Sequence, residues 1–184
     1  MPEDINKVKK EEVSQKVEEP SKGTSTTLKN EIFEWLKATF FGIIFFIILN
    51  IFLFPARVDG GSMLPNYYDG DRILVSRLAY RNKLPEYGDS VIFYCETRQY
   101  TLIKRVIGLP GDQIEIKDGA VYRNGTKLDE SEYIDCDTSG EINTIVDDGC
   151  LFVLGDNRPD SADSRYAEIG QVDLRNVKGK VVFR

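Results

Sequence analysis

The sequence contains no histidine, and this absence narrows the chemistry that the protein can perform. A Ser-His-Asp triad, a Cys-His pair and a zinc site with histidine ligands are all excluded. If the protein is a hydrolase, its general base must therefore be a carboxylate, a lysine or the amino terminus.

Cysteine is also scarce, with Cys95, Cys136 and Cys150 as its three occurrences. No C-x-x-C spacing is present, so we expect neither a metal site nor a redox motif. At most one disulfide can form, and Cys136–Cys150 is the conceivable pair. The alternative is that all three cysteines are small buried or surface residues.

An excess of positive charge is missing as well. The formal net charge is −6 and the pI is about 4.9, which argues against a nucleic-acid binder, since such proteins usually carry a basic patch. The length of 184 residues suits one domain of ordinary size and an appendage.

The start of the chain is hydrophilic, and a long apolar run follows it. We assign residues 1–31 to a disordered tail, because this part is dense in Lys, Glu, Ser and Thr. From Ala38 to Phe54 the chain has no charge, and about 17 helical residues cover about 26 Å, close to the hydrocarbon thickness of a bilayer. Trp35 suits the interfacial belt, so we predict a transmembrane anchor helix over residues 32–55.

Two features favour a retained anchor over a cleaved secretory signal. The apolar run is longer than a usual signal core, and the residues after it, from Pro55 to Val58, contain no A-x-A pattern. The flanking basic residues are Lys22, Lys29 and Lys37 before the run and Arg57 and Arg72 after it. We expect a single-pass protein of the cell membrane, and this weak bias favours a cytoplasmic N-terminus with residues 56–184 outside.

Beyond residue 57 the pattern changes to alternation with period two, which is typical of strands. The expected strands are Arg72–Arg77, Ser90–Tyr94, Tyr100–Ile107, Gln113–Ile116, Ala120–Arg123, Leu151–Leu154 and Lys180–Phe183. Asp118-Gly119 and Asn124-Gly125 predict hairpin turns, because these residues tolerate positive φ. We therefore predict a mostly β protein, in which one transmembrane helix precedes an antiparallel β domain over residues 56–184.

Four short blocks carry the chemistry. In the first, Asp59–Pro65, Ser62 stands between glycines and a proline, so its backbone turns tightly and a substrate can approach closely. Such a turn can expose a hydroxyl and direct backbone N–H groups at an oxyanion. Taken alone, the block fits an ordinary Gly-Gly turn better than a catalytic one.

The second block, Tyr100–Asp112, places a lysine among apolar residues. On a strand, Leu102, Lys104 and Val106 share one face. Burial disfavours the ammonium form, and lowering the pKa from ~10.4 to ~8 costs about 3 kcal/mol in the charged form. A catalytic base needs such a shift, whereas a structural lysine would extend its amine to water.

The other two blocks are less informative when they are taken alone. Gly155–Arg165 is a polar loop after an expected strand, and its hydroxyls and carboxylates could orient a lysine or pair with an arginine. It is also compatible with a solvated loop of Asx-turns. Tyr87–Tyr94 reads as a Gly-Asp turn that opens a strand.

Together the blocks closely resemble the signature of the bacterial type I signal peptidases, which are Ser–Lys proteases. After an anchor the chain shows G-x-S-M-x-P, G-D-x-V-x-F, K-R-V-I-G-L-P-G-D and G-D-N-R-x-x-S-x-D-S-R in the order of that family. The resemblance covers residues 57 to about 165 and implies an antiparallel β catalytic domain.

The resemblance also implies a role for each matching residue. Ser62 corresponds to the nucleophile, Lys104 to the general base and Ser161 to a hydroxyl that orients the lysine amine. The supporting residues are Asp156, Asp163 and Arg165, and the residues of the oxyanion turn are Gly60, Gly61, Met63 and Pro65. The chain departs from the pattern at Gly60, where some relatives have a serine, and at Asn66-Tyr67, where relatives often have Thr-Leu.

The activity implied is removal of signal peptides from exported preproteins at the lipid bilayer, with no metal, no cofactor and no nucleic-acid partner. A self-cleaving repressor-type protease shares the Ser–Lys pair, but it would need a DNA-binding domain where this chain has a membrane span. A catalytically silent, membrane-tethered binding module would fit if Lys104 were solvated and protonated. An organellar inner-membrane peptidase shares the chemistry and differs mainly in compartment.

Overall fold

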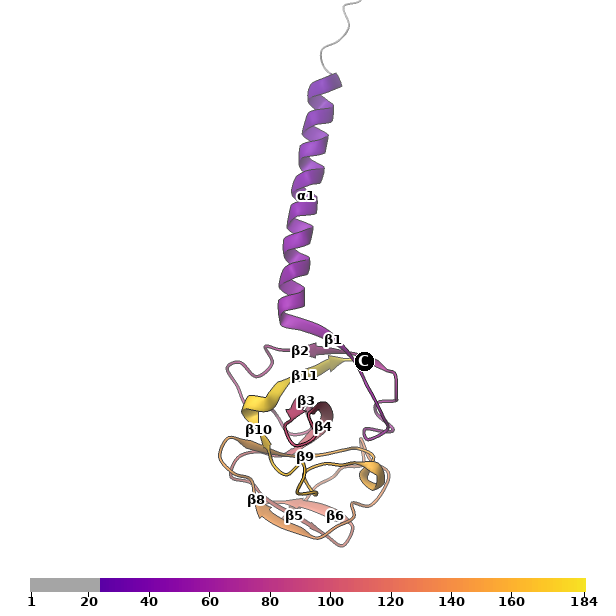
Figure 1. The fold of residues 1–184 in the computed structure, drawn as a ribbon, viewed down its shortest axis with the longest axis vertical. Coiled ribbons are helices and arrows are strands. Elements are labelled where there is room, and N and C mark those ends of the chain that lie inside the picture. The colour runs from indigo at the N-terminus through magenta and orange to yellow at the C-terminus, as the bar shows by residue number, and fades with distance from the viewer. Residues whose placement is uncertain (1–23) are drawn as a thin grey trace, which may run out of the picture. The chain divides into compact units, whose positions relative to one another are not determined.

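The computed structural model describes residues 24–184, which begin with a long helix and continue into β-sheets (Figure 1). The chain forms two compact units, the first ending at Ile44 and the second covering Phe45–Arg184. Helix α1 (Thr24–Phe52) contains the segment Asn30–Phe52, which is long and apolar enough to cross a membrane and has no buried part.

The bounds of this helix differ from the prediction at both ends. Residues 24–31 were expected in a disordered tail but are helical, and the tail's other residues, 1–23, lie outside the described part of the chain. The helix starts in a Thr-Ser-Thr-Thr run, and such residues favour helix N-termini. It ends at Phe52 rather than residue 55, because Pro55 lacks the N–H of a helical residue and disfavours helical φ/ψ at the residue before it.

The larger sheet has seven strands in the order β1-β2-β11-β3-β4-β9-β10, and the neighbouring strands pair antiparallel. Its strands are β1 (Leu53–Arg57), β2 (Arg72–Ser76), β3 (Ser90–Cys95), β4 (Tyr100–Gly108), β9 (Cys150–Leu154), β10 (Val172–Asp173) and β11 (Val177–Phe183). β1 lies at the edge of the sheet, which is where a strand tolerates Pro55.

The smaller sheet has four strands in the order β7-β6-β5-β8, also antiparallel. Its strands are β5 (Gln113–Lys117), β6 (Ala120–Arg123), β7 (Thr126–Lys127) and β8 (Ile142–Ile145). In Figure 1 this sheet lies at the opposite end of the β domain from β1 and β2. Two short 3₁₀ turns, η1 (Arg158–Asp160) and η2 (Leu174–Asn176), complete the described elements.

The mostly β fold class is confirmed, and all seven expected strands are present with ends that agree within three residues. The turns at Asp118-Gly119 and Asn124-Gly125 are confirmed too, and all four of these residues have positive φ. Sequence reasoning missed four strands. β7 and β10 have two residues each, β1 contains a proline, and β8 lacks a clear apolar alternation.

Three groups of buried side chains form the core of the β domain. One centres on β3, β4 and β9, a second joins the smaller sheet to β4 and β9, and a third lies between β1, β2 and their neighbours. Strand β4 contributes to the first two groups through Val106 and Ile107, so it is held on both faces. All three cysteines are free thiols, and the conceivable Cys136–Cys150 disulfide is not formed.

Candidate active site

The site is assembled where three segments meet. The turn that follows β1 carries Ser62, strand β4 carries Lys104, and the loop after β9 carries the polar block Gly155–Arg165. Because β4 pairs with β9, with Arg105 opposite Leu154, the start of this loop lies beside the lysine strand. Side chains that are far apart in the sequence therefore converge on one region.

The turn around Ser62 is held by its own backbone and by the loop after β9. Gly60 has φ of 87°, a conformation that residues with a Cβ rarely adopt. The Asn157 backbone N–H donates to the Ser62 carbonyl at 3.0 Å, and the Asn157 side chain donates to the Gly61 carbonyl at 2.9 Å. Met63 is fully buried and so anchors the turn to the core.

The expected residue Pro65 follows in the same turn, after a cis Leu64–Pro65 peptide bond. The Leu64 N–H donates to the Gly61 carbonyl, which closes the turn around the serine. In the described part of the chain, the Ser62 N–H has no hydrogen-bond partner. This N–H is therefore free to donate to a substrate oxygen.

Lys104 lies directly against the serine. Its Nζ donates to Ser62 Oγ at 2.7 Å and to the Ile103 carbonyl at 3.0 Å, and the residue is 1% exposed. Burial lowers the pKa of Lys104 from 10.5 to about 8, although the nearby carboxylates Asp163 and Asp156 raise it. The amine has no ion-pair partner within 4 Å among the described residues. With this pKa, about a tenth of the amine is neutral at pH 7.

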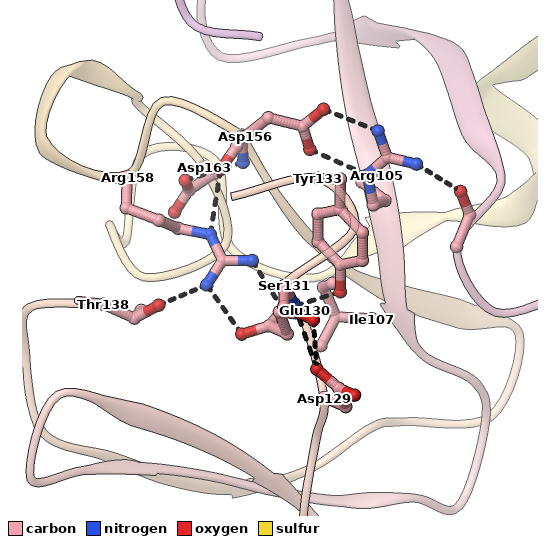
Figure 2. A network of polar contacts seen from close by, with 12 residues as sticks. Arg105, Ile107, Asp129, Glu130, Ser131, Tyr133, Thr138, Asp156, Arg158 and Asp163 are labelled. Atoms are coloured by element: carbon pink, nitrogen blue, oxygen red, sulfur yellow. Dashed lines mark hydrogen bonds and ion pairs between the residues drawn. The ribbon is translucent and has the colours of Figure 1, made fainter. Parts of the chain in front are cut away.

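The charged residue on the other face of β4 is accommodated differently. Arg105 forms a two-pronged ion pair with Asp156, at 2.7 Å from Nε to Oδ1 and 2.6 Å from Nη2 to Oδ2, as Figure 2 shows. Asp156 Oδ2 also accepts from Asn66 Nδ2 at 2.9 Å, and the same amide donates to the Tyr133 carbonyl at 2.7 Å. Asp156 thus connects the strand of the lysine to the turn of the serine.

Asp163 and Arg165 form a second buried pair beneath the site. Arg165 Nε lies 2.8 Å from Asp163 Oδ1, and its Nη2 lies 2.9 Å from Oδ2. The same carboxylate accepts the Gly155 N–H at 3.0 Å, while Arg165 also donates to the Arg158 carbonyl at 2.7 Å. The pair therefore holds the two ends of the polar loop together.

The geometry differs from the expectation at Ser161. Its hydroxyl is buried, but it has no hydrogen-bond partner within the described residues, and it makes no hydrogen bond with Lys104. The lysine amine is directed at Ser62 and at a strand carbonyl instead. Ser161 Oγ is nevertheless close by, because a Cβ added at Gly155 would lie 2.0 Å from it and 2.5 Å from the Ser62 carbonyl oxygen.

Sequence reasoning missed a buried ion pair that supports the same loop. Arg158 is 1% exposed, and its Nη2 lies 2.6 Å from Glu130 Oε1 (Figure 2). The guanidinium also donates to the Thr138 hydroxyl and to the Gly155 carbonyl. Arg158 lies in the polar block Gly155–Arg165 that the sequence analysis identified. Glu130 lies in an irregular segment, where no periodic pattern in the sequence could indicate that its side chain is buried. Among residues 24–184 no group of acidic and cysteine side chains is placed to hold a metal ion.

Ser62 opens onto two adjoining hollows. One has a volume of 360 Å³ and is lined mainly by apolar side chains, which are Phe54, Ala56, Val58, Ile73, Ile92, Leu102 and Ile103. The other measures 700 Å³, includes Lys104 and extends to Arg98 and Ala162. Both share Asp59 and the first residues of β4, so the serine lies on a single cleft with an apolar part.

Known proteins are similar in sequence to this chain over most of its length. A family profile described as signal peptidase, peptidase S26, matches residues 32–184. Signal peptidase I of Bacillus licheniformis is 35% identical over 86% of this chain and 91% of its own. Signal peptidase IB of Staphylococcus aureus strain COL is 34% identical over 85% of this chain and 91% of its own.

A solved structure is similar to part of this chain. It is the crystal structure of a signal peptidase I from Enterococcus faecalis V583, with 32% sequence identity and a TM-score of 0.47. The match covers 54% of this chain and 98% of the Enterococcus chain. The family match spans the serine turn, the lysine strand and the polar loop. The chain therefore belongs to the signal peptidase family, peptidase S26, and is a serine endopeptidase of that family.

Proposed function

We propose that this chain removes signal peptides from exported preproteins with a Ser–Lys dyad, in which Ser62 is the nucleophile and Lys104 the general base. The observation that carries the proposal is the 2.7 Å contact between Ser62 Oγ and the Nζ of a lysine that is almost completely buried. The chain has no histidine that could act as the base.

The first step is removal of the serine proton. Neutral Lys104 accepts the hydroxyl proton of Ser62 while Oγ attacks the carbonyl carbon of the scissile peptide bond. With a pKa of about 8, about a tenth of the amine is neutral at pH 7. The contact with the Ile103 carbonyl directs the amine at the hydroxyl, so no rearrangement is required.

The negative charge that develops on the substrate oxygen needs hydrogen-bond donors. The unpaired N–H of Ser62 is the donor that we assign, and the chain has glycine at position 60 where some relatives contribute a serine hydroxyl. The oxyanion is therefore stabilised by backbone groups. The lysinium then protonates the leaving amine, and the neutral lysine activates a water molecule that releases the acyl group.

Ser161 is proposed to act on the amine rather than on the substrate. A neutral lysine that accepts from Ser62 and donates to the Ile103 carbonyl retains one further N–H. The buried, unpaired hydroxyl of Ser161 is the partner that we propose for that N–H. Asp156, Asp163 and Arg165 then serve as positioning residues, because each contacts the turn, strand or loop that carries the reacting groups.

We propose the substrate from the hollow beside Ser62 and from the relatives, and the location of the enzyme from its apolar segment. The apolar hollow beside Ser62 suits apolar side chains before the cut, and the relatives are named signal peptidases. The apolar segment Asn30–Phe52 would hold the enzyme in the cell membrane, with the N-terminus cytoplasmic and the catalytic domain outside. At the outer surface of the membrane, the catalytic domain would meet the cleavage region of a signal peptide as it emerges from the bilayer.

The test is cleavage of a preprotein by the full chain in detergent, with the cut located by mass spectrometry. We expect a single cut after the signal peptide, and a loss of about 10⁴-fold or more in Ser62→Ala and in Lys104→Ala. Lys127→Ala is the matched control, because this exposed lysine lies in the smaller sheet, and it should cleave normally. Full activity in Ser62→Ala or Lys104→Ala would remove that residue from its role, and no cleavage by the wild type would favour the silent binding module.

A further inference from the structure

A further hollow of the β domain, which Ser62 does not line, is strongly basic. We call it the basic cavity. It has a volume of 280 Å³, and its lining includes four cationic side chains, Arg77, Arg81, Lys83 and Lys178, but no acidic one. The whole chain carries a formal charge of −6, so this grouping is opposite to the average charge of the protein.

Most of these charges lack a counter-ion. Within residues 24–184, Arg77, Arg81 and Lys178 form no ion pair, while Lys83 pairs with Glu86 at 2.6 Å. Arg77 stacks on the ring of Phe54 at 4.6 Å, which leaves the edge of its guanidinium available for hydrogen bonds. Four cations around one hollow repel one another, and a bound anion would relieve that repulsion.

The basic cavity also lies next to the end of the membrane-spanning segment. The Arg77 N–H donates to the carbonyl of Phe52 at 2.9 Å, and Phe52 is the last residue of that segment. The rest of the cavity wall is partly apolar, with Leu84 half-exposed and Leu174 beside it. A ligand for this place is therefore both anionic and amphipathic, and it is available at the surface of a bilayer.

We propose that the basic cavity binds the phosphate headgroup of an anionic phospholipid. Guanidinium groups recognise phosphate oxygens in pairs, and basic clusters beside a membrane span attract anionic lipids. The cavity volume is slightly below the range of about 300 to 1,000 Å³ that is typical of small-molecule pockets, so it suits a headgroup rather than a whole lipid. The apolar wall would contact the start of the acyl chains. This inference goes beyond the proposed peptidase activity and involves none of the residues assigned to its chemistry.

The experiment is native mass spectrometry of the full chain in detergent with equal amounts of dioleoylphosphatidylglycerol and dioleoylphosphatidylcholine. We expect the wild type to retain phosphatidylglycerol preferentially, and Arg77→Gln/Arg81→Gln to bind it about 30-fold more weakly, at about fivefold for each basic residue. The matched control is Arg72→Gln/Lys127→Gln, which removes two positive charges that lie outside the cavity and should change little. Lys178→Gln, a single exposed change, should weaken binding about fivefold and keeps the test decisive if the double variant fails to fold.

Three results would overturn the proposal: unchanged phosphatidylglycerol retention in both cavity variants, an equal loss in the control, or no preference over phosphatidylcholine in the wild type. Competition with soluble sn-glycerol 1-phosphate distinguishes the source of the phosphate. Displacement of the lipid at equal concentration would assign the cavity to free phosphate esters instead. Ser62→Ala should retain the lipid as the wild type does, so this assay and the cleavage assay can fail independently.

Discussion

The burial of Lys104 predicts a measurable effect of pH on stability. A change of pKa from 10.5 in the unfolded chain to about 8 in the folded one corresponds to about 3 kcal/mol against the charged amine. Between these two pH values the unfolded state binds more protons than the folded state, so the wild type becomes more stable as the pH rises. Below pH 8 the full cost is present, and above pH 10.5 it is absent.

Replacing the lysine by methionine removes this cost while nearly conserving side-chain volume. Lys104→Met also removes the hydrogen bonds to Ser62 Oγ and the Ile103 carbonyl, which contribute about 1 kcal/mol each at any pH. We therefore expect the free energy of unfolding of the variant to exceed that of the wild type by about 1 kcal/mol at pH 7. By pH 10.5 the difference should change sign, to about −2 kcal/mol.

The assay is urea unfolding of the full chain in neutral detergent, followed by the circular dichroism of the sheets, at several pH values from 7 to 10.5. Lys127→Met is the control, since Lys127 is exposed and forms no ion pair in the described structure, and it should show no trend with pH. A difference between Lys104→Met and the wild type that stays constant over this range would refute the argument, because the amine would then titrate alike in both states.

Four further predictions follow from the site. First, kcat/KM for preprotein cleavage should rise about tenfold per pH unit up to about pH 8 and then level off, because Lys104 must be neutral to act; a flat profile from pH 6 to 9 would exclude it as the base. Second, Asn66→Ala should lower kcat about tenfold or more with little change in KM, because the amide ties the serine turn to Asp156; an unchanged kcat would show that this tie is dispensable. Third, Glu130→Ala should lower the free energy of unfolding by about 3 to 5 kcal/mol, because it leaves the buried guanidinium of Arg158 unpaired. A loss of less than about 1 kcal/mol in chemical denaturation would contradict this expectation. Fourth, Gly155→Ala should abolish cleavage, because its Cβ would clash with the Ser62 carbonyl oxygen; normal activity would mean that the loop yields freely.

Local patterns in the sequence were enough for the main parts of the architecture. The uncharged run before Pro55 predicts a membrane-spanning helix because chain length and hydropathy set that choice alone. Asn124-Gly125 predicts its turn because positive φ is a property of those residues. Lys104 between Leu102 and Val106 indicates a buried amine, since alternation along a strand puts the three on one face.

Contacts between distant segments lay beyond the reach of those patterns. The Glu130–Arg158 pair joins residues 28 positions apart, and nothing local to Glu130 distinguishes it from a solvated carboxylate. Strand β1 was also missed, because a segment that contains a proline is held as a strand by its pairing with β2.

The sequence, through its motifs and their resemblance to a known family, predicted which residues would supply the chemistry: a serine in a glycine turn, a lysine on an apolar face and a polar loop. Tertiary structure alone decided how they meet. The 2.7 Å contact of Ser62 with Lys104 depends on the pairing of β3, β4 and β9 and on Asn157 holding the serine turn. The unpaired hydroxyl of Ser161 is likewise a product of packing. The physical reason is that residue type and period act over a few neighbouring positions, whereas burial, pKa and hydrogen-bond partners are properties of the assembled neighbourhood.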